Sequence, residues 1–154
     1  RGGEVLKFFG DGALAVFEIS DDDTECQIAC QKGMAAGQDA FAAISALNGV
    51  REAQGQPTMA LDLALHIGDV LYGNVGAEGR LDFTVIDPAA NEASRIETLC
   101  GTLDRNWLAP ESFYLSARHC SDAMEPMGQH QLHGLTGEWA LYSLPQNQQE
   151  AGWT

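Results

Sequence analysis

Two short runs of mostly apolar residues open the chain and predict a β-hairpin. EVLKFFG (4–10) and ALAVFE (13–18) are joined at a Gly-Asp-Gly sequence. An Asp-Gly turn between apolar runs is a strong hairpin signal. Strict alternation along the first strand would place Val5 and Phe8 on opposite faces. The turn would then present Asp11 at the tip of the hairpin.

A long amphipathic helix is predicted next. The acidic run Asp21–Thr24 offers capping residues for its start. Apolar side chains then recur at spacings of three and four residues, which is the pattern of one buried helical stripe. The helix should extend to about residue 50, before Gln54–Pro57 breaks it. The stripe consists of Cys30, Met34, Gly37, Phe41 and Ile44.

The middle of the chain alternates between strand and helix patterns. MALDLALHIG (59–68) has period-2 alternation that places His66 on its polar face, and this predicts a half-buried strand. A glycine-rich turn (72–80) and a strand LDFTVI (81–86) follow. Asp87-Pro88 then supplies an N-cap and a first helical residue for a helix over AANEASRIETL (89–99).

The last third predicts a short strand and helical turn over WLAPESFYLSA (107–117) and a closing hairpin over HQLHGLTGEWALYSL (130–144). No internal repeat or linker is visible, so we expect one domain over 1–145 and a polar tail over 146–154. Sequence-local hairpins alternating with helices predict an α+β sandwich, with helices packed on one face of a mainly antiparallel sheet.

The net charge limits the kinds of partner that this chain is expected to bind. The net charge of −14 argues against nucleic acid and anionic membrane, because both attract basic surfaces. No apolar run approaches the ~20 residues that span a bilayer. The four cysteines lack zinc spacing, so free thiols in a reducing cytoplasm are expected. Only two lysines exist, which makes Lys7, inside an apolar strand, more notable.

Two charged side chains of the hairpin have both structural and functional interpretations. Asp11 between glycines fits an ordinary turn residue, and it also fits a Mg²⁺ ligand on a rigid hairpin tip. Lys7 could protect an exposed strand edge from aggregation or donate to the base edge of a ligand. The residues alone leave both alternatives open.

The helix over 89–99 carries a second pair of candidates. Asn91 and Arg95 are four residues apart and share a helical face, so together they could hold a ribose oxygen and a phosphoryl group. The alternative is a surface Arg95 that pairs with Glu92. The glycines of 72–80 match no phosphate-loop motif, and His66 has no assignable partner.

Taken together, the motifs resemble the class III nucleotide cyclases, the catalytic domains of adenylate and guanylate cyclases. GGEVLKFFGDGALAVF looks like the family hairpin K-x-x-G-D-x-x-x-A-x-F. HIGDVLYGNVGAEGRLDFTVIDPAANEASRIETL looks like the family's second block, H-x-G-x-V-x-x-G-N-x-G followed by D-[FY]-T-V-I-G-x-x-V-N-x-A-[AS]-R-[IL]-E. The two blocks cover about half of the chain. The resemblance implies a ferredoxin-like nucleotide cyclase fold.

The resemblance also implies roles for single residues. Asp11 matches a carboxylate that holds two Mg²⁺ or Mn²⁺ ions per site. Lys7 and Thr84 match the base-selecting pair, and this combination favours adenine. Asn91 and Arg95 match the residues that orient the ribose and stabilise charge at the reacting phosphate. The implied activity is conversion of ATP to 3′,5′-cyclic AMP and pyrophosphate in the cytoplasm.

In the family, active sites lie between two chains, so the resemblance implies a homodimer in which Asp11 and Lys7 of one chain serve opposite sites. The family's first metal-binding Asp lies upstream of the hairpin, so we expect the domain to be N-terminally incomplete, lacking its first strand and helix. An attached sensor or regulatory domain is also expected. The opening R-G-G-E resembles the diguanylate cyclase signature, but that signature forms the hairpin turn itself.

Two alternatives stay open. A cyclase-like regulatory domain would dimerise and bind nucleotide without turnover, and the absence of an Asp before Asp11 favours it. A guanylate cyclase is disfavoured by Lys7 and Thr84, because the resemblance would then lead us to expect Glu and Cys.

Overall fold

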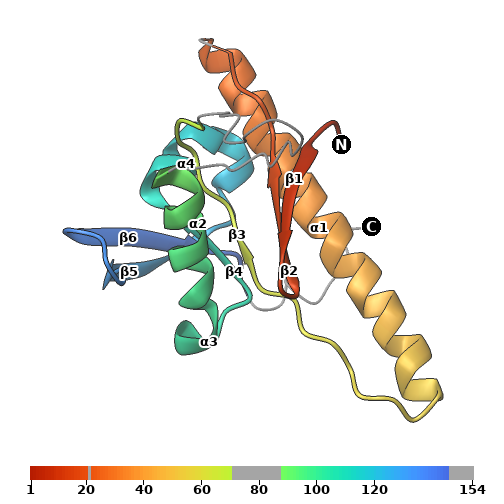
Figure 1. The fold of residues 1–154 in the computed structure, drawn as a ribbon. Coiled ribbons are helices and arrows are strands. Elements are labelled where there is room, and N and C mark those ends of the chain that lie inside the picture. The colour runs from red at the N-terminus through yellow and green to blue at the C-terminus, as the bar shows by residue number, and fades with distance from the viewer. Residues whose placement is uncertain (21, 71–87, 146–154) are drawn as a thin grey trace, which may run out of the picture.

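The computed structural model describes residues 1–20, 22–70 and 88–145. It places a two-stranded hairpin and a four-stranded sheet beside one long helix (Figure 1). Thr84, the predicted turn 72–80, the strand 81–86 and the tail 146–154 lie outside the described residues. The α+β prediction is confirmed, and three of the four pairs of neighbouring strands are antiparallel.

The predicted N-terminal hairpin is confirmed. β1 (Glu4–Phe9) pairs with β2 (Gly12–Val16), and Gly10 has the positive φ of 58° that such a turn needs. The pairing shifts by one residue after Val5, where β1 contains a β-bulge. The strict alternation predicted from the sequence is therefore wrong. Val5 and Phe8 lie opposite Ala15 and Ala13, so they share one face of the hairpin.

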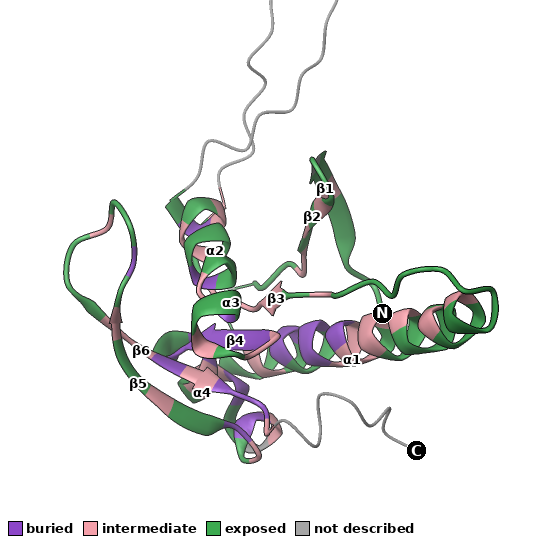
Figure 2. Ribbon diagram, turned by 90° about the horizontal axis from the view of Figure 1, so that it is seen from below, coloured by how far each residue is buried: buried purple, intermediate pink, exposed green. Residues whose placement is uncertain are grey.

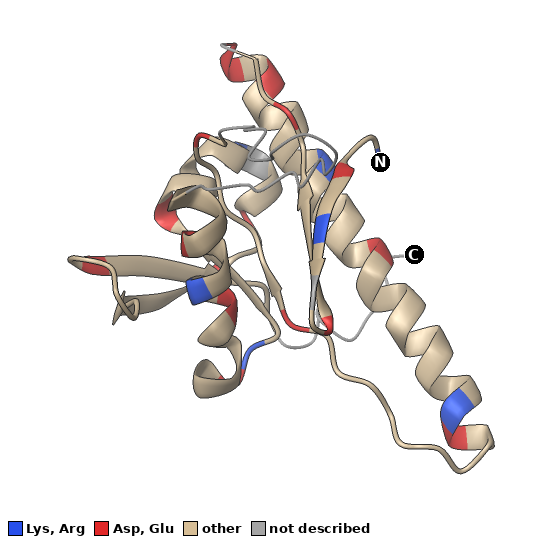
Figure 3. Ribbon diagram, viewed as in Figure 1, with Lys and Arg blue, Asp and Glu red and all other residues tan. Residues whose placement is uncertain are grey.

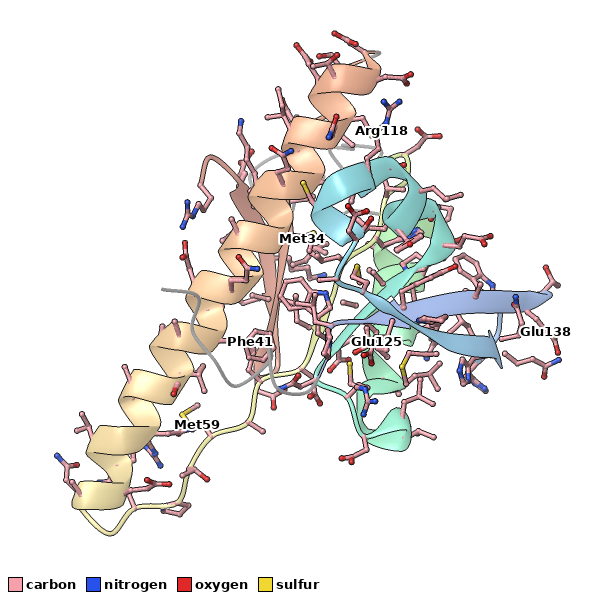
Figure 4. All side chains as sticks on the ribbon, turned by 180° about the vertical axis from the view of Figure 1, so that it is seen from behind. Met34, Phe41, Met59, Arg118, Glu125 and Glu138 are labelled. Atoms are coloured by element: carbon pink, nitrogen blue, oxygen red, sulfur yellow. The ribbon has the colours of Figure 1, made fainter. Side chains whose placement is uncertain are left out.

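The long helix α1 (Asp23–Ala53) begins where the acidic run predicts. The side chain of Asp22 accepts a hydrogen bond from Thr24 N and caps the first turn. The predicted stripe is confirmed, since its first three members are buried and its last two are half-buried. Figure 4 shows Met34 and Phe41 on the side of α1 that packs against the sheet. The helix ends at Ala53, three residues beyond the predicted limit of about residue 50.

The four-stranded sheet has the order β3-β4-β6-β5. β3 (Leu63–Ala64) runs parallel to β4 (Trp107–Pro110), and β6 (Glu138–Ser143) is antiparallel to both β4 and β5 (Glu125–Gln131). The predicted strand over 59–68 is therefore reduced to two paired residues. The closing hairpin is confirmed, and its first strand begins five residues earlier than expected.

The remaining helices connect these strands. α2 (Pro88–Thr98) begins at the predicted proline, and α4 (Glu111–Ala117) follows β4 directly. Two short segments are additions to the sequence prediction: α3 (Cys100–Leu103) and the 3₁₀ turn η1 (Arg118–Ser121).

The core has two parts, one on each face of the sheet. Trp107 and Ala109 of β4 pack with α1 and α4, whereas Leu108 between them packs with Ile96 and Cys100 of α2 and α3. The alternation of β4 therefore buries both of its faces. Helices cover both faces of the four-stranded sheet, not one as the sequence suggested, and Figure 2 shows the buried segments of β4 and α1 side by side.

The hairpin joins the rest of the domain through α1. A Cβ placed on Gly33 of α1 would lie 3.7 Å from Phe17, just after β2, and 3.7 Å from Leu65, just after β3. The same helix face thus contacts both the hairpin and the four-stranded sheet. Within the described residues the two sheets share no strand pairing.

Candidate functional site

Asp11 lies in the two-residue turn between β1 and β2, and its side chain is exposed. The left-handed Gly10 before it makes the turn tight, so the carboxylate is presented at a well-defined point. Lys7 lies in β1 opposite Leu14 and is also exposed. A single short hairpin therefore presents both predicted hairpin residues to solvent.

Negative charge gathers between the hairpin turn and α2. Burial raises the pKa of Glu97 above its ordinary value, and the charges of Asp62 and Asp11 raise it further. Asp11 is therefore one of two negative charges that act on this α2 side chain through space. Asp11 and Glu97 belong to motifs that are more than seventy residues apart in the sequence.

The carboxylate of Asp11 is a suitable oxygen ligand for Mg²⁺ or Mn²⁺. However, the described residues contain no group of three His, Cys, Asp or Glu side chains arranged to hold a metal ion. In the described part of the chain, Asp11 is therefore the one predicted ligand of the two-metal site that the family resemblance implies.

Helix α2 divides into a buried face and an exposed face. Ala89 and Ile96 are buried against the sheet, whereas Asn91 and Arg95 are exposed. Neither of the exposed pair forms a hydrogen bond or ion pair with another described residue. Both side chains are therefore available to a ligand from the same side of the helix.

The alternative pairing of Arg95 with Glu92 is wrong in this structure. Glu92 Oε2 instead lies 2.7 Å from Nε2 of His66, at the end of the β3 segment. The alternation in the sequence predicts that His66 lies on a polar strand face, and it indicates no partner for the side chain. The structure covers that face with α2, and nothing in the local pattern near His66 signals this contact.

Basic side chains are few across the fold. Figure 3 shows isolated Lys and Arg positions among many acidic ones, including one in β1. Arg1 pairs with Asp39 and Arg118 with Asp23, whereas Lys7 and Arg95 have no ion-pair partner in the described part of the chain. In an acidic protein, two unpaired cations on candidate motifs favour an anionic ligand.

A separate hollow of about 320 Å³ lies at the far end of the hairpin from Asp11, lined by Gly2, Glu4, Val16, Phe17, Glu18 and Lys32. Its walls combine two carboxylates with one lysine, and it contains none of the predicted site residues. We therefore place the candidate site at the hairpin turn and α2.

Comparison with known proteins links both motifs to one family. The chain is 36% identical over 128 residues to an adenylate cyclase from Anabaena cylindrica, covering 74% of this chain and 24% of that protein. It is 26% identical over 145 residues to adenylate cyclase 1 of Rhizobium meliloti, covering 92% and 21%. The chain belongs to the class III nucleotide cyclases, of the bacterial adenylate cyclase type.

The fold of this cyclase domain agrees with the sequence comparison. The crystal structure of the guanylyl cyclase Cya2 matches with a TM-score of 0.72 at 20% identity, covering 92% of this chain and 69% of that one. At that identity the likeness shows the fold alone. No model of a known protein family matches the chain.

The cyclase domain spans about a quarter of the length of the curated relatives it matches. None of the helices that the structure describes is long and apolar enough to cross a membrane. Its four cysteines are free thiols, as predicted, and Cys30 and Cys100 are buried. Burial raises the pKa of both of these thiols to about 12, so they are protonated at neutral pH.

Proposed function

We propose that this domain converts ATP to 3′,5′-cyclic AMP and pyrophosphate. The observation that carries the proposal is the arrangement of its two motifs. The hairpin presents Asp11 and Lys7 to solvent, and α2 presents Asn91 and Arg95 without a partner in the described residues, so both halves of such a site are open to a ligand or to a second chain. The likeness to named adenylate cyclases supports the same reaction.

The reaction needs positioning and charge stabilisation more than a protein nucleophile. The ribose 3′-hydroxyl loses its proton, its oxygen bonds to the α-phosphorus, and the bond from that phosphorus to the bridging oxygen breaks. Pyrophosphate then leaves. We assign Arg95 to the phosphoryl oxygens, because a guanidinium donates several hydrogen bonds in one plane. We assign Asn91 to the ribose.

The divalent ions are part of the proposal. When bound, two Mg²⁺ or Mn²⁺ ions would lower the pKa of the 3′-hydroxyl and neutralise the triphosphate. Asp11 would hold them together with carboxylates from outside the described residues. Lys7 would contact the adenine ring, with Thr84 as its partner in selecting the base.

The outer face of the hairpin supports a homodimer. Val5 is 53% exposed and Phe8 is 77% exposed, and both share this face with Ala13 and Ala15. An exposed apolar face next to charged candidate residues is typical of an interaction surface. We propose that a second copy covers it and that each active site combines residues of both chains.

Product formation by the full-length protein tests the proposed reaction. Supplied with Mn²⁺ and ATP, it should release cyclic AMP and pyrophosphate in equal amounts. Arg95→Ala and Asp11→Asn should each reduce the rate at least about a hundredfold, as the loss of transition-state contacts typically does. Asp23→Asn, which changes an exposed carboxylate at the start of α1, is the control and should leave the rate unchanged.

Each contrary outcome has a defined meaning. Cyclic GMP as the main product would favour the guanylate alternative, which is the activity named for the structural neighbour Cya2. Binding of nucleotide without product would favour the regulatory alternative. An unchanged rate in Asp11→Asn would contradict the metal assignment.

A further inference from the structure

The hydrogen bond between His66 and Glu92 lies where the segment after β3, helix α2 and strand β6 meet. His66 follows β3, Glu92 lies on α2, and the ring of Trp139 on β6 lies 6.0 Å from the imidazole at an angle of 57°. The His66 side chain is only 7% exposed and the Glu92 side chain 23%. The contact is therefore shielded from water, which strengthens it relative to a surface pair.

A second contact joins the same two segments. His66 and Gly68 are two residues apart and lie on the same side of the extended chain. A Cβ on Gly68 would come within 2.7 Å of the Cβ of Ala89, so the backbone there touches the first turn of α2. Helix α2 thus meets the end of the β3 segment at two points, one apolar and one polar.

The position of Glu92 on the helix gives the polar contact a particular effect. At about 100° per residue, Ala89 and Ile96 define the buried side of α2, and Asn91 and Arg95 define the exposed side. Glu92 lies between the two sides. The packing of Ala89 and Ile96 decides which side of α2 is buried, and a hydrogen bond to a carboxylate is in addition directional. The bond to His66 therefore restricts the rotation of α2 about its axis further than apolar packing alone.

Glu92 is also the group that holds the histidine ring. The ionised carboxylate can only accept, so the ring donates through Nε2. Within the described part of the chain the buried Nδ1 atom has no hydrogen-bond partner. Loss of Glu92 would leave no other described polar group to orient the ring.

We propose that His66 and Glu92 are positioning residues for Arg95 and Asn91, an inference that rests on the proposed cyclase reaction. Through the directional bond at the border of α2, they set the angle at which the exposed face of the helix meets the triphosphate and ribose. Neither residue contacts the substrate in this account. Their effect is on the rate of the chemical step and not on nucleotide affinity.

Kinetics of paired variants in the full-length protein test this role. Glu92→Ala and His66→Ala should each lower kcat for ATP about tenfold or more while KM changes less than about twofold, because misorientation costs rate before it costs binding. Glu92→Gln and His66→Gln keep a hydrogen-bonding group at the same reach and should restore most of kcat. The double alanine variant should be no slower than the slower single variant.

Two controls separate positioning from folding. Ser94→Ala changes an exposed side chain of α2 that forms no hydrogen bond or ion pair with another described residue, and it should leave kcat unchanged. Thermal unfolding shows whether each variant folds. If the alanine variants do not fold, Glu92→Met and His66→Leu, which fill a similar volume without forming a hydrogen bond, replace them in the comparison.

The outcomes distinguish this inference from the proposed function. If the wild type forms no cyclic nucleotide, the proposed reaction fails and the positioning role fails with it. If the wild type is active and the folded alanine variants keep kcat, or lose kcat additively in the double variant, the positioning role alone is overturned.

Discussion

The pKa of Glu97 depends on the negative charge near the hairpin turn. Its pKa lies above the ordinary value of 4.5, first because of burial and then because of Asp62 and Asp11. A carboxyl group whose folded pKa is raised binds its proton more tightly in the folded state. Its contribution to stability is therefore fully favourable below about pH 4.5 and is lost as the pH rises through the folded pKa.

Glu97→Gln should therefore stabilise the protein at pH 7 relative to the wild type. The gain should be a fraction of a kcal/mol, because solvent screens this partly exposed group. At pH 4 the gain should shrink, since the wild-type carboxyl is then protonated. Chemical denaturation at both pH values measures the difference, with the exposed Glu138→Gln as control. An equal effect of Glu97→Gln at both pH values would contradict the raised pKa.

A variant of Asp11 tests the electrostatic effect of this residue on Glu97. Asp11→Asn removes one of the charges that raise the pKa of Glu97, so this pKa should fall. Asp23→Asn, which changes an exposed carboxylate at the start of α1, should leave the pKa of Glu97 unchanged. NMR titration of the Glu97 carboxyl carbon measures both. No change in Asp11→Asn would contradict an electrostatic effect of Asp11 on Glu97.

We propose that Lys7 and Thr84 select the base. Lys7→Glu combined with Thr84→Cys should weaken the preference for ATP over GTP by at least about tenfold, because the hydrogen-bond pattern offered to the purine edge is reversed. The ratio of kcat/KM for the two nucleotides measures this preference. A ratio that stays at the wild-type value in an active variant would remove both residues from the base site.

At the scale of whole elements, α1 determines how close the four-stranded sheet can approach. A Cβ on Gly37 would lie 2.5 Å from the ring of Trp107 and 2.9 Å from Leu63. The glycine thus allows a close contact in the core. By contrast, Gly49 near the other end of the helix has nothing within 4 Å of such a Cβ.

These two glycines make a matched pair of substitutions. Gly37→Ala should destabilise the protein by about 1–3 kcal/mol, because the added methyl overpacks the core. Gly49→Ala should stabilise it by up to about 1 kcal/mol, because alanine is the better helix former and the site is open. Urea denaturation of both variants measures the changes. Equal effects would contradict the close packing of α1 on Trp107.

Elements defined by local patterns could be predicted from the sequence. The Gly-Asp-Gly turn predicts the hairpin, Asp22 of the acidic run caps α1, and Pro88 begins α2. Features set by contacts between elements could not be predicted. No residue type marks the bulge after Val5, and the polar face that carries His66 is covered by helix α2, whose Glu92 is 26 residues further along the chain.

The candidate site also combines features that local sequence patterns predict with features that depend on contacts between elements. The positions of Asp11, Asn91 and Arg95 on exposed surfaces follow from turn chemistry and helical spacing, and the structure confirms this exposure. The bond of Glu92 to His66 requires knowledge of how α2 packs on the sheet. The roles that the family resemblance assigns to these residues remain predictions, as does that of Thr84.

At the scale of the whole molecule, we propose that each active site is formed by two chains. Asp11 of one chain would act with Lys7, Asn91 and Arg95 of the other, across a two-fold axis. Variants that each remove one half of the site should therefore complement each other when they share a dimer. A site built within one chain would show no such recovery.

Co-expression of full-length Asp11→Asn and Arg95→Ala chains tests this most directly, with cyclic AMP formation from ATP and Mn²⁺ as the readout. Each variant alone should be inactive. Random pairing makes half of the dimers mixed, and each mixed dimer has one intact site of two, so activity should recover to about a quarter of the wild-type value. A co-expressed sample as inactive as its parents, beside an active wild type, would contradict an active site shared between two chains.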